Sequence, residues 1–213
     1  MKNQNKLLAY EHRLMAQGYQ RIAGIDEVGR GPLAGGVLAC ACMLDLDTDI
    51  EGINDSKKLS EKKRMKLTHS IQSTAKAYAY GYCNEKEVDD LNIYQASKLA
   101  MLRAVKNLKI KPDFLLVDAM NLDIDIPQLS VIKGDTLSAS IGAASILAKV
   151  KRDFIMVQMD HLYPGYGFNR HKGYPTKYHL QQLKKLRPCK IHRRTYKPVK
   201  DLLEEQLSLE LEG

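Results

Sequence analysis

The segment QRIAGIDEVGRGPLAGGVLACACML, residues 20–44, contains two apolar runs separated by glycines and a proline. Residues 20–28 and 35–44 have the composition of buried strands, and Gly-Arg-Gly-Pro at 29–32 is a turn-forming sequence. So short a connection predicts an antiparallel hairpin. The first strand ends in two adjacent carboxylates, Asp26 and Glu27, which a glycine-rich backbone follows at once.

Three further strands are expected outside this hairpin. Residues 75–83 alternate in polarity, with three tyrosines on one face of a half-buried strand. Residues 113–119 form a compact apolar run, typical of a central strand, and residues 128–134 are a shorter candidate.

Helices are expected between and after the strands. Ser60 is a plausible N-cap for a helix over 61–74, and other helical patterns cover 2–13, 92–108, 138–159 and 177–186. Residues 201–213 fit either a final helix or a frayed tail. In the helix over 138–159 one apolar stripe is expected, and its many small residues suggest close packing against a sheet; the stripe consists of Ile141, Ala144, Leu147, Val150, Phe154 and Val157. Helices alternating with strands predict an α/β layered domain with a mixed sheet.

The length and composition fit one substantial domain, or one domain with an appended subdomain, and we expect a cytoplasmic protein. The chain has 213 residues, 44% of them hydrophobic, and we see neither a secretory signal nor a membrane span. Four cysteines lack metal-type pairing, and we interpret them as reduced packing residues: Cys40, Cys42, Cys83 and Cys189.

The net charge of +8 has a local origin, because eleven Lys and Arg and no acid lie between Asp160 and Asp201. The same segment carries five tyrosines, which suggests contact with a polyanion that offers surfaces for stacking. A solvated face with its tyrosines in the core is an equally open interpretation.

Four acids occupy comparable places in the predicted fold. Asp26 and Glu27 end the first strand, Asp118 ends the central strand, and Asp135 precedes the small-residue helix. Ligands of open α/β sheets bind beyond strand ends, so these acids can converge on one cleft. Divalent cations such as Mg²⁺ or Mn²⁺ would relieve their repulsion, and two such ions can hydrolyse a phosphodiester. Alternatively, Asp135 caps its helix, Asp118 stabilises a loop and Glu27 is an exposed strand-end residue.

Seven segments resemble, in order, those of the bacterial ribonuclease HII family: GIDEVGRGPLAG, NDSKKLS, LLVDA, IKGD, AASILAKVKRD, YGFNRHKGYPT and HRRTYKPV. The resemblance covers about residues 20–200. It implies a ribonuclease H-like α/β fold, a mixed sheet flanked by helices. We expect one domain over 1–213, with a catalytic core at about 20–160 and a basic, mainly helical part at about 161–213.

The resemblance also implies an activity: hydrolysis of the RNA strand of RNA/DNA hybrids, and incision 5′ of single ribonucleotides in duplex DNA. Ligands of Mn²⁺ or Mg²⁺, in a two-metal mechanism, would be Asp26, Glu27, Asp118 and Asp135. Gly29, Arg30 and Gly31 match the family's ribonucleotide-sensing backbone, and Tyr174 matches the tyrosine that works with it. Thr195-Tyr196 departs from the expected Ser-Phe, which concerns packing rather than catalysis.

Elementary chemistry supports the glycine-rich sensor. A 2′-hydroxyl donates and accepts hydrogen bonds, and a backbone without Cβ atoms can approach it closely. Ser56, Lys57 and Lys58 are expected to contact phosphates, although solvated loop lysines would look the same in sequence. Tyr174 can stack on a sugar or base, or can be a packing residue. Among the six histidines none has metal-ligand spacing, and only His171 is considered near substrate.

Three other functions stay open at this point. A non-catalytic hybrid-binding protein would need only the basic segment. Ribonuclease HIII shares the core but carries an extra N-terminal domain, whereas about twenty residues precede the first strand here. Another metal nuclease of the same fold, such as a resolvase or integrase, would not need the Gly-Arg-Gly segment with Tyr174. Nothing in the sequence demands more than a monomer.

Overall fold

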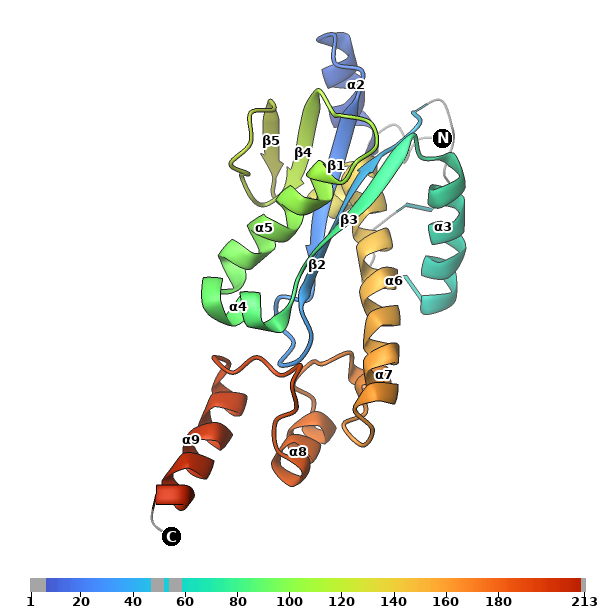
Figure 1. The fold of residues 1–213 in the computed structure, drawn as a ribbon. Helices are drawn as coiled ribbons and strands as arrows, with labels where there is room; N and C mark the ends of the chain where they lie inside the picture. The colour runs from blue at the N-terminus through green and yellow to red at the C-terminus, as the bar shows by residue number, and fades with distance from the viewer. Residues whose placement is uncertain (1–6, 47–51, 54–58, 212–213) are drawn as a thin grey trace. The chain divides into compact units, whose positions relative to one another are not determined.

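The computed structural model describes residues 7–46, 52–53 and 59–211. Strands in these ranges form one mixed sheet in the order β3-β2-β1-β4-β5 (Figure 1). β1 is antiparallel to β2 and parallel to β4, and β4 is parallel to β5. The strands are β1 (Ile22–Val28), β2 (Val37–Met43), β3 (Ala77–Cys83), β4 (Phe114–Asp118) and β5 (Gln128–Val131). The predicted mixed α/β sheet and the predicted hairpin are therefore confirmed.

Helices follow the predicted pattern with two additions, α4 and the four-residue helix α7. Ser60 and Thr176 act as N-caps of α3 and α8, accepting from the third backbone N–H of each helix. The first unexpected helix, α4, begins at a capping box formed by Asn84 and Glu87. The helices are α2 (Ala9–Ala16), α3 (Glu61–Thr74), α4 (Glu85–Leu91), α5 (Ile93–Lys106), α6 (Ala139–Leu162), α7 (Phe168–His171), α8 (Lys177–Leu186) and α9 (Lys197–Leu211), with a 3₁₀ turn η1 (Gly134–Thr136). Of the two interpretations of the C-terminal end, the helix is correct as far as Leu211. Across the described ranges, no helix is both long and apolar enough to span a bilayer.

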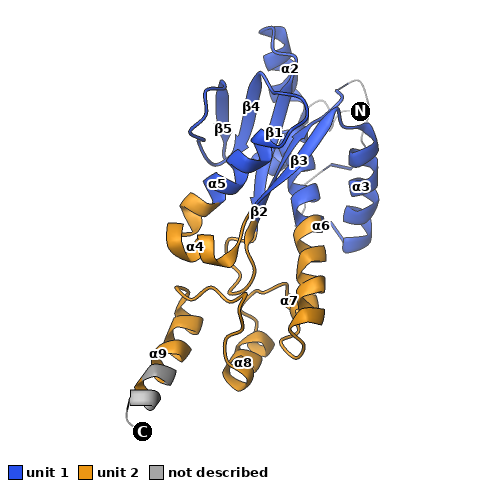
Figure 2. Ribbon diagram, in the orientation of Figure 1, with its two compact units in different colours: residues 1–28, 38–82, 97–150 blue, residues 29–37, 83–96, 151–213 orange. Residues whose placement is uncertain are grey.

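The chain divides into two compact units (Figure 2). Unit 1 comprises residues 1–28, 38–82 and 97–150, and unit 2 comprises residues 29–37, 83–96 and 151–213. All four candidate metal-binding acids belong to unit 1, whereas the Gly-Arg-Gly segment and Tyr174 belong to unit 2. The expectation of one domain stays a prediction.

Unit 1 is built by close approach of helices to the sheet. A methyl group at Gly24 of β1 would lie 2.1 Å from the carbonyl carbon of Ser140, and one at Gly81 of β3 would lie 2.0 Å from the carbonyl oxygen of Ala100. The first part of α6 and the later part of α5 thus pack with their backbones against strands, as the small residues of α6 predicted. All four cysteines are free, and three of them are buried in or beside the sheet.

The second half of α6, which belongs to unit 2, departs from the predicted apolar stripe. Phe154 is 57% exposed, whereas Arg152 and Met156 are 1% exposed. The physical reason is that the Arg152 guanidinium binds three backbone carbonyls, so the helix turns this side chain inward instead of Phe154. Met156 packs with Tyr166 and Phe168 in the core of this unit.

Candidate functional site

The register of the parallel strands brings Asp26 and Asp118 to neighbouring places. Ile25 of β1 pairs with Val117 of β4, and each aspartate is the next residue in its strand. Both side chains therefore start from the carboxyl ends of adjacent parallel strands, where α/β sheets bind their ligands. The sequence predicted this juxtaposition from two separate apolar runs.

Asp26 is a buried carboxyl with acidic neighbours. It is 7% exposed, and its Oδ1 accepts a hydrogen bond of 2.7 Å from the backbone N–H of Glu27. Burial raises the pKa of Asp26 well above its usual value, and the charges of Glu27 and Asp118 raise this pKa further. Hydrogen bonds from Ser145 and from the Glu27 backbone act in the opposite direction. Glu27 and Asp118 are thus each close enough to Asp26 for their charges to repel its charge.

Asp135, the fourth acid, is connected to Asp118 through one residue. Asp118 Oδ1 accepts a hydrogen bond of 2.7 Å from the backbone N–H of Gly134, so the end of β4 is tied to η1, where Asp135 is 7% exposed. The helix-cap interpretation of Asp135 is wrong, because Ser138 Oγ accepts the N–H of Ile141 and caps α6. The loop-stabilising interpretation of Asp118 is correct, and it brings Asp118 and Asp135 together.

A buried glutamate that the sequence analysis missed fixes the start of α6. Glu11 of α2 is 0% exposed. Its Oε1 accepts a hydrogen bond of 2.6 Å from Ser138 Oγ and one of 2.9 Å from the backbone N–H of Ser140. A carboxylate at a helix N-terminus satisfies free N–H groups and the helix dipole. Glu11 thereby holds the segment that follows Asp135.

The chemistry of the acids fits a hard divalent cation. Among the residues that the structure describes, no group of three or more His, Cys, Asp and Glu side chains is already arranged to hold a metal ion. However, all four candidates are carboxylates, the donors that Mg²⁺ and Mn²⁺ prefer. Burial and, after it, the charges of Glu27 and Asp118 raise the pKa of Asp26, and a bound cation would relieve this repulsion. The assignment of these ligands stays a prediction.

In unit 2 the Gly-Arg-Gly segment is held by a buried arginine. Arg193 is 0% exposed and donates to the carbonyls of Gly29, Arg30 and Gly35. It also donates to the hydroxyl of Tyr196 over 2.8 Å, and this hydroxyl donates to the Arg30 carbonyl over 2.8 Å. The tyrosine that stands where phenylalanine was expected therefore adds a hydrogen bond to the segment.

Arg152 packs against Gly29 and holds the residues that follow the Gly-Arg-Gly segment. Its guanidinium donates to the carbonyls of Ala34 and Gly36, and also to that of Lys172. A methyl group at Gly29 would lie 2.2 Å from Arg152 Nε, and the φ of Gly29 is +97°. Glycine at this position thus has a packing and conformational reason, in addition to the predicted access for a ribose.

Tyr174 lies beside Gly31, as the predicted pairing requires. A methyl group at Gly31 would be 3.6 Å from Tyr174 Cε1, and the tyrosine is 38% exposed. The preceding residue, Gly173, accepts a hydrogen bond of 2.8 Å from the backbone N–H of Leu33. The exposed ring of Tyr174 and the exposed Gly31 thus share one surface of unit 2.

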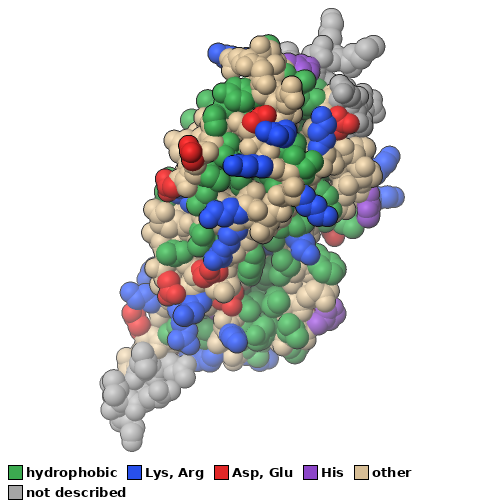
Figure 3. All heavy atoms as spheres, turned by 45° about the horizontal axis from the view of Figure 1, so that its top comes forward, with side chains coloured by type: hydrophobic (Ala, Val, Ile, Leu, Met, Phe, Trp, Pro, Cys, Tyr) green, Lys and Arg blue, Asp and Glu red, His purple; other side chains and the backbone are tan. Residues whose placement is uncertain are grey.

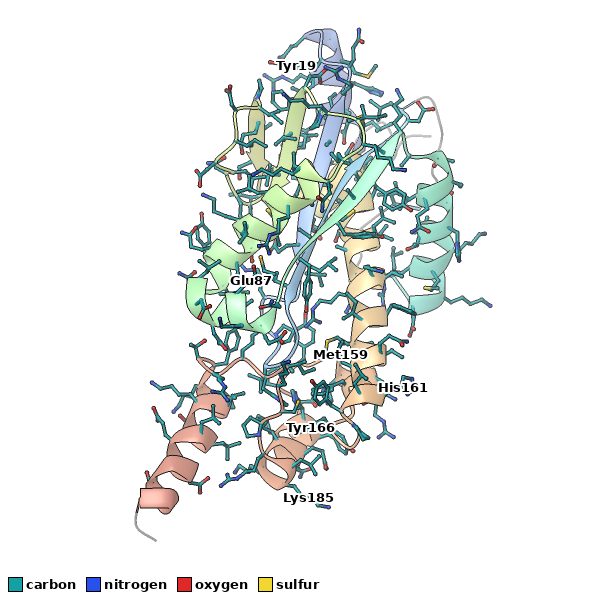
Figure 4. The ribbon with its side chains drawn as sticks, in the orientation of Figure 1. Tyr19, Glu87, Met159, His161, Tyr166 and Lys185 are labelled. Carbon is teal, nitrogen blue, oxygen red and sulfur yellow. The ribbon has the colours of Figure 1, made fainter. Side chains whose placement is uncertain are left out.

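The other tyrosines of the basic segment have different roles. Tyr166, which points inward in Figure 4, is 7% exposed and stacks on Phe168 at 5.2 Å between ring centroids. The core interpretation is correct for this residue. Tyr178 is 41% exposed and lies under the Arg170 guanidinium, so it is not a core residue, and contact of this segment with a polyanion stays a prediction.

Exposed charge accompanies these residues. Figure 3 shows Lys and Arg side chains over much of the face that it draws, interspersed with acidic side chains. Three of the eleven basic residues form ion pairs with acids of α9 in the described part of the chain: Arg187 with Glu205 at 3.1 Å, Lys197 with Asp201 at 3.0 Å and Lys200 with Glu204 at 3.5 Å. The predicted phosphate contacts Ser56, Lys57 and Lys58 lie outside the described residues.

Comparison with known proteins gives consistent matches. Residues 23–199 match the family model described as Ribonuclease HII. A Ribonuclease HII of Desulfitobacterium hafniense (strain Y51) is 53% identical over 199 residues, which cover 93% of this chain and 76% of the relative. The crystal structure of the ribonuclease H2 from Pyrococcus horikoshii OT3 has a TM-score of 0.74 and 25% identity, and the match covers 87% of this chain and 98% of that chain. Bst-RNase HIII in complex with Mn²⁺ has a TM-score of 0.64 and 17% identity, with 87% and 70% covered. The predicted ribonuclease H-like fold is confirmed.

Proposed function

Because this chain belongs to the ribonuclease HII family and is therefore a ribonuclease H, we propose that it acts on two related substrates. It hydrolyses the RNA strand of RNA/DNA hybrids, and it incises duplex DNA 5′ of a single embedded ribonucleotide, leaving 3′-hydroxyl and 5′-phosphate ends. These reactions serve primer removal and ribonucleotide removal. Family membership disfavours the ribonuclease HIII alternative.

The observation that carries the proposal is the repulsive group of carboxylates at the ends of β1 and β4. Burial and the charges of Glu27 and Asp118 raise the pKa of Asp26 well above its usual value. The repulsion between these carboxylates destabilises the protein when no metal is bound. A protein that only bound hybrids would gain nothing from such an arrangement. Asp26, Glu27, Asp118 and Asp135 are the residues that would hold Mg²⁺ or Mn²⁺. The ions would activate a water molecule and stabilise the leaving oxygen of the phosphodiester. The solved Bst-RNase HIII, which shares the fold, is in complex with Mn²⁺.

The protein's own groups position these carboxylates. The Glu27 N–H orients Asp26, and the Gly134 N–H orients Asp118. Glu11 fixes the start of α6 through Ser138. Such fixed hydrogen bonds reduce the reorganisation that the reaction requires.

Recognition of the ribonucleotide is assigned to the Gly29–Gly31 backbone and Tyr174. A 2′-hydroxyl can donate to a carbonyl and accept from an N–H of this backbone, while the exposed tyrosine stacks on the sugar or base. Arg30, which is exposed, would bind a phosphate. Ser56, Lys57 and Lys58 are proposed as further phosphate contacts. We propose that the enzyme acts as a monomer in the cytoplasm without a membrane partner, and its four free cysteines support this location.

The test uses duplex DNA with one embedded ribonucleotide, with Mg²⁺, with Mn²⁺ or with a chelator. We expect one cut 5′ of the ribonucleotide, metal-dependent, with a 3′-hydroxyl that a polymerase can extend. Asp118→Asn should lower the rate by about a thousandfold or more while binding persists, because asparagine keeps the shape but loses the charge. Asp123→Asn, an exposed change in the same unit, is the matched control.

The outcomes separate the remaining alternatives. Tight binding without cleavage under any metal would indicate a hybrid-binding protein. Cleavage that ignores the ribonucleotide would indicate another metal nuclease of this fold. Near wild-type rates for Asp118→Asn with saturating Mg²⁺ would overturn the metal assignment.

A further inference from the structure

Three histidines of unit 2 form a contiguous group that the sequence analysis did not detect. The rings of His171 and His179 stack at 4.2 Å between centroids and an interplanar angle of 14°. His179 Nε2 lies 3.2 Å from His192 Nε2. All three are buried, with exposed fractions of 9%, 0% and 2%. Each comes from a different segment, so the group depends on the tertiary fold.

Backbone hydrogen bonds determine where each ring carries its proton. The Cys189 N–H donates to His192 Nδ1 over 3.0 Å, so the proton of His192 is on Nε2 and points to His179. His179 therefore accepts at Nε2 and donates from Nδ1 to the carbonyl of Tyr174, 2.9 Å away. In the same way, the Gly173 N–H donates to His171 Nδ1 over 3.1 Å, which leaves the His171 Nε2 proton for a carbonyl.

Every hydrogen bond of the three rings can form when each ring carries one proton. The hydrogen bonds of the group are therefore all made only when all three imidazoles are neutral. The His171 Nε2 proton goes to the Tyr166 carbonyl, 2.9 Å away. An added proton on His179 Nε2 would face the Nε2–H of His192. Burial lowers the pKa of His179 and of His192 to about 4 in each case, and it also lowers the pKa of His171. The neutral state is thus the resting state at physiological pH.

The chain of hydrogen bonds ends on the backbone of Tyr174. The Tyr174 carbonyl accepts from His179 Nδ1 and from the Thr176 N–H, and the Tyr174 N–H donates to the His171 carbonyl. Gly173, between His171 and Tyr174, is itself fixed by the Leu33 N–H. The side chain of Tyr174 is 38% exposed and starts from this fixed backbone, so the backbone sets where the ring begins.

We propose that His179, oriented by His192, is a positioning residue that sets the place of Tyr174 against Gly31 and thereby the discrimination of a single ribonucleotide. This inference rests on the proposed function for its kinetic consequence. The hydrogen-bonded histidine group itself can be tested without any substrate. A single embedded ribonucleotide allows one register, so a displaced tyrosine costs more there than on a continuous RNA strand, where neighbouring 2′-hydroxyls compensate.

The first experiment observes the protons of the wild-type protein. Histidine ¹⁵N chemical shifts, measured by long-range ¹H–¹⁵N correlation at pH 7.5, distinguish the two neutral tautomers from each other and from the cation. We expect the Nδ1–H form for His179 and the Nε2–H form for His171 and His192. An Nε2–H or a charged His179 would overturn the proposal, whether or not the protein cleaves nucleic acid.

The second experiment compares two isosteric replacements. In His179→Asn the side-chain amide occupies the place of Nδ1 and can still donate to the Tyr174 carbonyl, whereas in His179→Gln it occupies the place of Nε2. We expect His179→Gln to lower kcat/KM for the single ribonucleotide, relative to a long hybrid, by about five- to tenfold, the range of one lost hydrogen bond. His179→Asn should stay within about twofold of wild type. His161→Gln, an exposed histidine that points away in Figure 4, is the control.

A double-mutant cycle separates positioning from general damage. If His179 acts through Tyr174, His179→Gln should change the substrate ratio little in a Tyr174→Ala background. An undiminished effect in that background would refute the proposal, as would equal losses on both substrates. If the wild-type protein cleaved neither substrate, the proposed function would be refuted. The tautomer measurement would then be the test of the histidine group.

Discussion

Arg193→Lys is the change that tests most directly how the Gly-Arg-Gly segment is held. The guanidinium of Arg193 is 0% exposed and serves the carbonyls of Gly29, Arg30 and Gly35 at once. A lysine ammonium keeps the charge, but it is a compact donor that cannot reach all three carbonyls that the planar guanidinium binds. At least two of these acceptors should therefore lose their partner.

The expected cost follows from the number of contacts. A hydrogen bond to a charged group contributes about 1.5–3 kcal/mol, so two lost contacts predict about 3–6 kcal/mol of lost stability. Tyr196→Phe removes only the hydroxyl that joins Arg193 to the Arg30 carbonyl, which predicts about 1 kcal/mol. Domains are stable by only about 5–15 kcal/mol, so the first variant should be marginal and the second well folded.

The assay is urea unfolding followed by circular dichroism, with the slope of the transition compared between variants. Arg194→Lys, a change at an exposed neighbouring arginine, is the matched control and should stay close to wild type. The reasoning fails if Arg193→Lys costs no more than Tyr196→Phe. Equal effects would mean that this loop is held by the backbone bonds that Leu33 makes with Gly173 and Gly35 makes with Ile191, rather than by the buried guanidinium.

Two further predictions concern charge. Without metal, the raised pKa of Asp26 means that the folded protein holds this proton more tightly than the unfolded chain, so stability should fall as pH rises from about 4 through the raised pKa. Asp118→Asn should weaken this fall and raise the thermal midpoint in a chelator at pH 7.5; an unchanged or lower midpoint would contradict the repulsion. Replacing Lys184 and Lys185, exposed on α8, with glutamine should lower the slope of log K against log salt by about two for every duplex if both contact phosphates. An unchanged slope, measured by fluorescence anisotropy with Lys66→Gln and Lys86→Gln as the control, would place them off the binding surface.

Much of the fold could be predicted because its signals are local. The two apolar runs around Gly29–Gly36 define the hairpin, and Ser60 and Thr176 mark the start of helices as caps. The acids at strand ends could be placed because strand order only had to bring β1 beside β4. The missed helix α4 also carries a local signal, the Asn84–Glu87 capping box, but seven residues are too few for a clear apolar period.

The side chains that hold unit 2 together could not be predicted in this way. Arg152 and Arg193 stand within the quoted segments AASILAKVKRD and HRRTYKPV, yet in sequence they count only as charges. Most of their partners are backbone carbonyls more than a hundred residues away, such as those of Gly36 and Gly29. Every residue offers a carbonyl, so no residue type marks an acceptor in the sequence. The predicted apolar stripe of α6 is wrong at Phe154 for the same reason, because the carbonyl partners of Arg152 cannot be recognised in the sequence.

The structure contains two groups of buried titratable side chains, the carboxylates around Asp26 and the three histidines. Burial acts on both groups, but the two groups indicate different roles. Burial raises the pKa of Asp26 and lowers that of His179, and in each case it favours the neutral form. The histidines satisfy one another, since each proton of the group has an acceptor and the chain ends on a carbonyl. Asp26 instead faces Glu27 and Asp118, whose charges add to the cost of its own. A satisfied group is typical of a scaffold, and a repulsive group of carboxylates is typical of a site that binds a cation. On this distinction we propose the carboxylates of unit 1 for catalysis and the histidines of unit 2 for positioning.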